Sequence, residues 1–227
     1  MSKIWTRDSE MSGRRKKLWM ILTSVAVIVA ALLIWFYRTQ TVWVESELYQ
    51  RESKEPTKTL VVVYSRTGNT LGSAKEIAKY FDADVLKIEA PQYSRDLKGQ
   101  LLASKHADEE ITTATIKHDP VDLNQYELIF LCSPTWWYRP AIPLWSFVEN
   151  HAFEGKQVFL MMTGNSRMTE ERTGKFKILV EEKKGVFLDV LFINRGRIYW
   201  QKTPDQVNKE VREALNERKE MWRKAER

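Results

Sequence analysis

The sequence predicts an α/β domain with a parallel sheet, preceded by one helix long enough to cross a membrane. Beyond residue 58, five short apolar segments alternate with helical patterns, which is typical of repeated strand–helix units. The first apolar segment, residues 59–64, is a continuous Val-rich run, as expected for a strand covered on both faces. Residues 18–37 carry no charge and would span about 30 Å as a helix.

Four segments follow from these observations: a basic tail (residues 1–17), a transmembrane helix (18–37), a polar linker (38–58) and the α/β domain (59–227). The transmembrane helix, from Leu18 to Tyr37, is expected to lie in a lipid bilayer. Aromatic rings that favour the membrane interface stand near its ends at Trp19, Trp35 and Tyr37.

The positive charge of the chain is concentrated near its N-terminus. The formal net charge is +6, and residues 1–38, with seven cations and two carboxylates, account for +5 of it. The remaining domain is close to neutral and has no basic stripe interleaved with aromatic residues. We therefore expect no nucleic-acid partner.

The flanks of the apolar segment predict its orientation. Residues 14–17 read Arg-Arg-Lys-Lys, whereas Arg38 is followed by Glu45 and Glu47. The positive-inside rule places the N-terminus in the cytoplasm and the α/β domain outside it, at the cell membrane. A twin-arginine export signal is an alternative, although Lys17 stands where such signals prefer an apolar residue. Cleavage is not favoured, because no small-x-small site precedes Arg38.

The elements of the domain follow from periodicity and punctuation. The first predicted helix, residues 69–81, places Leu71, Ala74 and Ile77 on one face. The last, 204–224, begins with a Thr-Pro pair and carries Trp222 on its apolar face. The other predicted strands cover residues 84–89, 127–132, 157–162 and 185–193, and the other helices 96–109, 142–149 and 170–183.

The loop after the first strand is a candidate phosphate-binding turn. It reads Ser65-Arg66-Thr67-Gly68-Asn69-Thr70 and opens the first helix of the domain. Glycine permits a tight turn in which several N–H groups converge on one anion, and the helix start adds further unpaired N–H groups. The spacing matches neither a Walker A loop nor a dinucleotide-binding turn. An ordinary strand-to-helix turn with an N-cap threonine remains the alternative.

Three motifs resemble those of the flavodoxin family, over residues 57–209. The loop, with Tyr64 before it, resembles the flavodoxin phosphate loop. The run Tyr126-Glu-Leu-Ile-Phe-Leu-Cys-Ser-Pro-Thr-Trp-Trp137 resembles the third strand and first flavin-ring loop. Residues 153–158 and the strand leading to Thr163-Gly164-Asn165 resemble the fourth strand and the second ring loop.

The resemblance implies a flavodoxin-like three-layer sandwich with a five-stranded parallel sheet in the order 2-1-3-4-5, and FMN as cofactor. Ligands in such sheets bind at the carboxyl ends of the strands, where the strand order reverses. The residues expected at FMN are the phosphate loop Ser65, Arg66, Thr67, Gly68, Asn69 and Thr70, the ring loop Pro134, Thr135, Trp136, Trp137 and Tyr138, and the ring edge Thr163, Gly164 and Asn165.

The ring loops depart from the family pattern at two places. Tyr138 stands where related domains often have glycine, and Thr163-Gly164-Asn165 stands where the motif usually reads Thr-Ser-Gly. The domain is also not acidic, unlike many soluble flavodoxin carriers. No side chain is a convincing acid, base or nucleophile, so no catalytic residue is predicted. The single cysteine, Cys132, is expected to be buried, and the histidines lack metal-ligand spacing.

Three functions remain open from the sequence. The first is a membrane-anchored FMN protein that transfers electrons between a redox partner protein and a small or protein acceptor. The second is an NAD(P)H-dependent flavin or quinone reductase, an oxidoreductase on the same fold. The third is a flavin-free binding module, since a fold does not by itself determine function.

Overall fold

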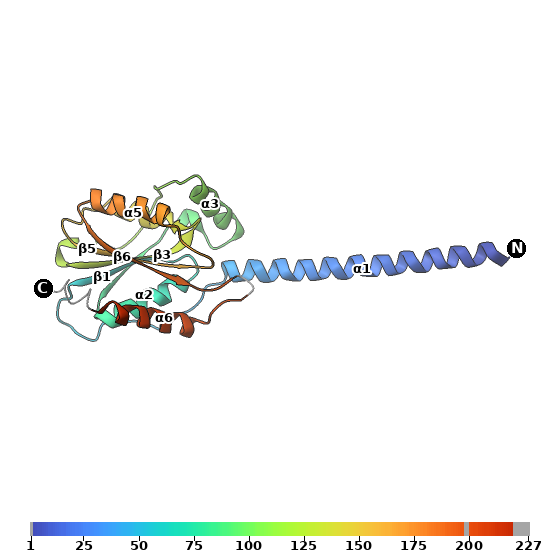
Figure 1. The fold of residues 1–227 in the computed structure, drawn as a ribbon, viewed down its shortest axis with the longest axis horizontal. Coiled ribbons are helices and arrows are strands. Elements are labelled where there is room, and N and C mark those ends of the chain that lie inside the picture. Colours follow the sequence, from blue (N-terminus) through green and yellow to red (C-terminus); the bar gives the residue numbers. More distant parts are fainter. Residues whose placement is uncertain (1, 198–199, 220–227) are drawn as a thin grey trace. The chain divides into compact units, whose positions relative to one another are not determined.

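The computed structural model describes residues 2–197 and 200–219 and divides the chain into two units, Met1–Gln40 and Thr41–Arg227. Helix α1 (Ser2–Thr41) forms the described part of the first unit, and only its last residue is counted with the second (Figure 1). Within its segment Gly13–Thr41, a window of 18 residues has a mean hydropathy of 2.5, and none of that window is buried in the protein. The chain thus has one N-terminal helix that is long and apolar enough to cross a membrane.

The second unit contains the parallel sheet that the sequence predicts. The strand order is β2-β1-β3-β5-β6, which confirms the expected order 2-1-3-4-5. One further strand, β4, is two residues long and pairs antiparallel with β3, so the sheet has six strands rather than five. The strands are β1 (Thr59–Tyr64), β2 (Asp84–Ile88), β3 (Leu128–Trp136), β4 (Arg139–Pro140), β5 (Gln157–Gly164) and β6 (Val186–Asn194).

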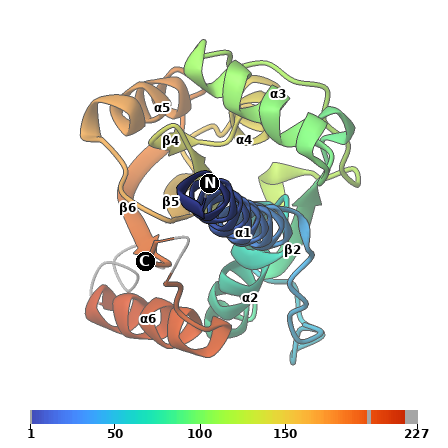
Figure 2. The same cartoon turned by 90° about the vertical axis from the view of Figure 1, so that its right-hand side faces the viewer.

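Helices cover both faces of the sheet. In Figure 2, α2 and α6 lie on one side of the strands, and α3, α4 and α5 lie on the other. This confirms the three layers. Their bounds are α2 (Asn69–Phe81), α3 (Leu97–Asp108), α4 (Ile142–Glu149), α5 (Glu170–Glu182) and α6 (Pro204–Glu217), with two short 3₁₀ helices, η1 (Pro91–Tyr93) and η2 (Leu123–Gln125).

Helix α6 begins where the sequence predicts, and its described part is Pro204–Glu217. Thr203 and Gln206 form the capping box at its start, and the N–H of Arg218 bonds to the Leu215 carbonyl at its end. The expected end at Lys224, and the expected packing of Trp222, lie outside the described residues.

The two faces of the sheet bury separate apolar clusters. On β1, Val61 and Val63 pack with α2 and α6, whereas Leu60 and Val62 pack toward α3, α4 and α5. This alternation explains why β1 reads as an unbroken apolar run. Cys132 is fully buried in β3, as expected, and burial raises the pKa of its thiol above the ordinary range.

Strand β3 runs four residues beyond the predicted end. Pro134, expected in the ring loop, is instead in β3 opposite Thr163 of β5, and Pro140 is in β4 opposite Thr135. Proline has no N–H to donate, but its carbonyl can still accept a hydrogen bond. The Pro134 carbonyl accepts one from the Ala141 N–H. The expected aromatic loop is therefore largely a β-hairpin.

Most of the predicted polar linker is docked on the α/β domain. Residues 43–55, which we call the arm, pack along α2 and belong to the second unit. The Tyr49 hydroxyl donates to the carbonyls of Ala78 (3.0 Å) and Ala83 (2.8 Å) at the end of α2. The rings of Trp43 and Tyr49 pack against the apolar cluster beneath α2, and their burial explains why a mostly polar segment docks.

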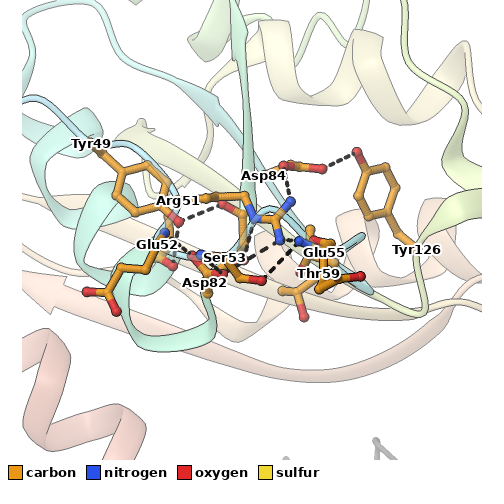
Figure 3. A network of polar contacts seen from close by, with 12 residues as sticks. Tyr49, Arg51, Glu52, Ser53, Glu55, Thr59, Asp82, Asp84 and Tyr126 are labelled. Carbon is orange, nitrogen blue, oxygen red and sulfur yellow. Dashed lines mark hydrogen bonds and ion pairs between the residues drawn. The ribbon is translucent and has the colours of Figure 1, made fainter.

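A polar network holds the far end of the arm (Figure 3). The carboxylate of Asp82 accepts bonds from the backbone N–H groups of Glu52 (2.8 Å) and Ser53 (3.0 Å), and Arg51 lies beside both Asp82 and Asp84. Desolvation raises the pKa of Asp82, but the N–H donors of Glu52 and Ser53 and the Arg51 charge outweigh it. The pKa of Asp82 therefore lies below its ordinary value of 3.8.

We expect Asp82→Asn to destabilise the protein at neutral pH, because it removes the charge while keeping a residue that tolerates the left-handed backbone found here (φ 45°). A carboxylate with a depressed pKa contributes stability above its unfolded pKa, and this contribution is lost as pH falls through the folded pKa. Thermal unfolding should show a gap between wild type and variant at pH 7 that closes below about pH 3.8. Asp119→Asn, at an exposed carboxylate with no ion pair in the described chain, is the control. A gap independent of pH would contradict the charge argument.

Candidate functional site

The turn between β1 and α2 presents unpaired backbone donors. Gly68 is the N-cap of α2 with φ 85°, and no side chain caps the helix. Within the part of the chain that the structure describes, the N–H groups of residues 67–71 donate to no acceptor. Helix starts leave such groups unpaired, and a turn that adds more of them forms an anion-binding nest. The backbone of the predicted phosphate loop is therefore suited to an anion.

Several side chains of this loop make contacts within the protein. The Asn69 amide donates to the Thr67 hydroxyl (3.1 Å), so these two residues lie together at the turn. Thr70 is buried, and its hydroxyl shares a hydrogen bond of 2.8 Å with that of Thr163. The Arg66 guanidinium reaches the carbonyl of Ser94 (3.2 Å). The Thr70 hydroxyl thus links the loop to the end of β5, and its predicted contact with a phosphate stays a prediction.

The three consecutive aromatic residues occupy different environments. Trp136 is half-buried between Tyr64 and Tyr93, in edge-to-face contacts with centroids 5.6 and 5.0 Å away. Trp137 is 45% exposed, and its indole N–H donates to the Ser104 hydroxyl (3.1 Å). The half-buried Tyr138 lies 5.3 Å from the Arg167 guanidinium. Of the expected ring slot, only Trp137 presents a largely open aromatic surface.

The turn between β3 and β4 is strained. Trp137 (φ 47°) and Tyr138 (φ 65°) are both in the left-handed region, which bulky residues rarely adopt. Tyr138 thus adopts a backbone conformation that favours glycine, the residue that related domains often have at this position. Such strain persists only where surrounding contacts hold it, and it concentrates at functional sites.

The predicted ring-edge residues lie at the ends of β3 and β5. The Thr135 hydroxyl donates to the Thr163 carbonyl (3.2 Å). A Cβ at Gly164 would lie 2.9 Å from that same hydroxyl, so only glycine fits beside Thr135 without a shift. The side-chain carbonyl of Asn165 accepts from Gln201 (3.3 Å). The structure therefore brings Thr70, Thr135 and Thr163 together, with Asn165 beside them.

Arg195 is a site residue that the sequence analysis missed. It follows β6 and bonds to Gln201 (3.3 Å), with no carboxylate in ion-pair range among residues 2–197 and 200–219. Desolvation lowers its pKa to about 10. It lines a hollow of about 550 Å³ with Gly68 and Asn69. The sequence signal that could have identified Arg195 is its position directly after β6, the last predicted strand, because ligands bind at this edge of a parallel sheet.

A second hollow, of about 920 Å³, lies on the other side of the loop. Ser65, Arg66, Tyr64 and Tyr93 line it, together with Trp43 of the arm. The Tyr64 hydroxyl is buried and has no hydrogen-bond partner in the described residues. Burial raises its pKa, so the group is a neutral donor. The hollow has the size of a small-molecule site.

The chain belongs to the flavodoxin family, since the family model named Flavodoxin matches residues 58–196. A comparison with curated proteins found no match.

Solved structures share the fold. A flavoprotein from Lactobacillus acidophilus NCFM, crystallised in complex with FMN, is 21% identical (TM-score 0.53) and aligns over 60% of this chain and 93% of its own. A protein from Bacteroides uniformis that has been assigned as a flavoprotein is 20% identical (TM-score 0.54), over 70% and 99%. One from Bacteroides eggerthii is 19% identical (TM-score 0.53), over 70% and 96%.

The residues present fit an FMN phosphate. The unpaired N–H groups of residues 67–71 supply donors, and Gly68 permits the tight turn with φ 85° that gathers them. Trp137 is an exposed ring at the neighbouring strand end, where a flavin ring would need a flat apolar surface.

We expect Thr70→Val to destabilise the domain by about 1–3 kcal/mol, because it leaves the buried Thr163 hydroxyl without its partner. Thr163→Val should have a similar effect, and the double variant should cost less than the sum of the two. Chemical denaturation of all four proteins measures this coupling. Strictly additive effects would show that the two hydroxyls do not interact.

Proposed function

We propose that this protein binds FMN at the turn between β1 and α2 and transfers electrons through it. The observation that carries the proposal is the set of unpaired N–H groups at residues 67–71. These groups follow β1, whose neighbours β2 and β3 are reached in opposite directions along the sheet. This is the reversal point at which open parallel sheets bind ligands.

The redox chemistry would be supplied by the flavin, and this chain would bind and orient it. The loop N–H groups would bind the phosphate, and the exposed face of Trp137 would contact the ring. Electron transfer needs no proton donor or nucleophile from the chain, which agrees with the lack of an obvious catalytic residue. The partner is a redox protein or a small electron acceptor.

We also propose that α1 anchors the protein in the cell membrane with its N-terminus in the cytoplasm. The support is the apolar segment of α1 and the four cations at residues 14–17 before it. The flavodoxin domain would then lie outside the cytoplasm, where its acceptor must also be.

Thr67→Glu should weaken FMN binding at least tenfold, because a carboxylate at the nest repels the phosphate; tenfold corresponds to about 1.4 kcal/mol. The control is Thr67→Gln, because glutamine has the size of glutamate but no charge. This variant should bind FMN much more tightly than Thr67→Glu does. Fluorescence titration of the detergent-solubilised full chain with FMN and riboflavin measures both, and riboflavin binding should be similar in the two variants. A colourless wild-type protein that fails to bind added FMN would refute the proposal.

The orientation of the domain can be measured by protease accessibility. In cells whose outer barrier has been permeabilised, added protease should degrade the flavodoxin domain, whereas inverted membrane vesicles should protect it. Replacing residues 14–17 with neutral residues should reduce this asymmetry, because it removes most of the cation bias. Protection in the permeabilised cells would place the domain in the cytoplasm.

A further inference from the structure

The start of the arm lies directly against the phosphate loop. The Val44 N–H donates to the Thr67 carbonyl at 2.9 Å. A Cβ placed on Gly68 would lie 2.0 Å from the Val44 carbonyl oxygen and 3.2 Å from the Trp43 indole. Gly68 is thus required twice, by its φ of 85° and by the arm backbone that passes over it.

Helix α2 holds this part of the arm in place. The Lys75 ammonium donates to the carbonyl and hydroxyl of Ser46 (3.3 and 2.8 Å) and to the Glu47 carbonyl. The Lys79 ammonium pairs with the Glu47 carboxylate at 3.0 Å. Several contacts therefore fix residues 46–47 one turn beyond the loop, and Val44 is positioned by a clamped segment.

The bond from Val44 has a consequence for the donors of the loop. In a trans peptide the C=O and N–H point in opposite directions. Because the Thr67 carbonyl is directed at Val44, the Gly68 N–H in the same peptide must be directed away from the arm. The Gly68 N–H is one of the unpaired donors of the nest.

We propose that Val44 is a positioning residue for the FMN phosphate: its N–H holds the Thr67–Gly68 peptide in the orientation that presents the Gly68 N–H to the anion. This role rests on the proposed function. It makes the arm part of the cofactor site, so the site extends beyond residues 58–196, which match the family model.

The test removes the donor of Val44 in the full chain. Val44→Pro eliminates the N–H, and Val44 lies outside the helices and strands, so the substitution removes no helix or sheet hydrogen bond. Leu48→Pro is the matched control, because the Leu48 N–H bonds to no described group and its side chain is 93% exposed. Affinity for FMN and for riboflavin is measured for each protein in detergent.

We expect Val44→Pro to weaken FMN binding about tenfold while riboflavin affinity stays unchanged, and Leu48→Pro to alter neither. Unchanged FMN affinity in Val44→Pro would overturn the role of the arm alone. An equal loss of FMN and riboflavin would also overturn it, because it indicates general disruption. A wild-type chain that binds neither flavin would refute the proposed function and this role together.

A cross-link provides a second measurement that does not depend on proline. The Cβ of Ser46 lies 3.6 Å from the position of a Cβ at Gly72, within the range of a disulfide. The Ser46→Cys, Gly72→Cys variant should form this bond, since the native Cys132 is buried. With the arm locked in place, FMN affinity should equal or exceed that of the reduced variant. Loss of FMN binding on oxidation, reversed by dithiothreitol, would show that the arm blocks the site instead of supporting it.

Discussion

The parallel pairing of β1 with β3 is the constraint on which the candidate site depends. Val63 stands opposite Cys132, so the two strands reach the carboxyl edge of the sheet together. The turn after β1 and the hairpin after β3 are brought side by side although more than sixty residues separate them in sequence. The same geometry adds the end of β5, because Pro134 pairs with Thr163. The site is therefore formed by several loops, which the register of the sheet brings together.

Within this frame, small residues set how closely the loops approach. The hydroxyls of Thr70 and Thr163 share a hydrogen bond, and the Thr135 hydroxyl donates to the Thr163 carbonyl. Glycine at position 164 leaves room for Thr135. The polar side chains that the family motif suggests as ligands thus act largely on one another, while backbone N–H groups are left to face an anion. A buried hydroxyl must find a partner, and here the nearest partner is another loop.

Local sequence patterns were sufficient for most of the fold. The bounds of β1, α2 and α4 are as expected, because continuous apolar runs, helical periodicity and Pro near a helix start are strong local signals. The C-terminal ends of β3 and β5 lie beyond their predicted ends. The pairing of the two strands extends each of them past its own apolar run, and this pairing is not visible in either segment alone. The β3–β4 hairpin was missed because its turn uses Trp137 and Tyr138 in a conformation for which glycine is the usual signal.

The candidate site was predicted in outline but not in its contacts. The motif located the loop, yet periodicity could not show that the Thr70 hydroxyl would turn to Thr163. The arm was missed because segment composition was used to infer a tether, whereas two aromatic rings and a lysine on α2 determine its docking. Arg195 lay in a short polar run whose importance appears only once β6 is placed beside β5.

The solitary thiol of Cys132 bears on where electrons can be stored. It is enclosed in β3 and kept protonated by its apolar surroundings, and the chain has no other sulfhydryl with which to couple. Peroxides and disulfide reagents therefore have no accessible thiol to oxidise. Reversible dithiol–disulfide chemistry within this sequence is therefore excluded, so under the proposed function the reducing equivalents must be carried by a bound molecule.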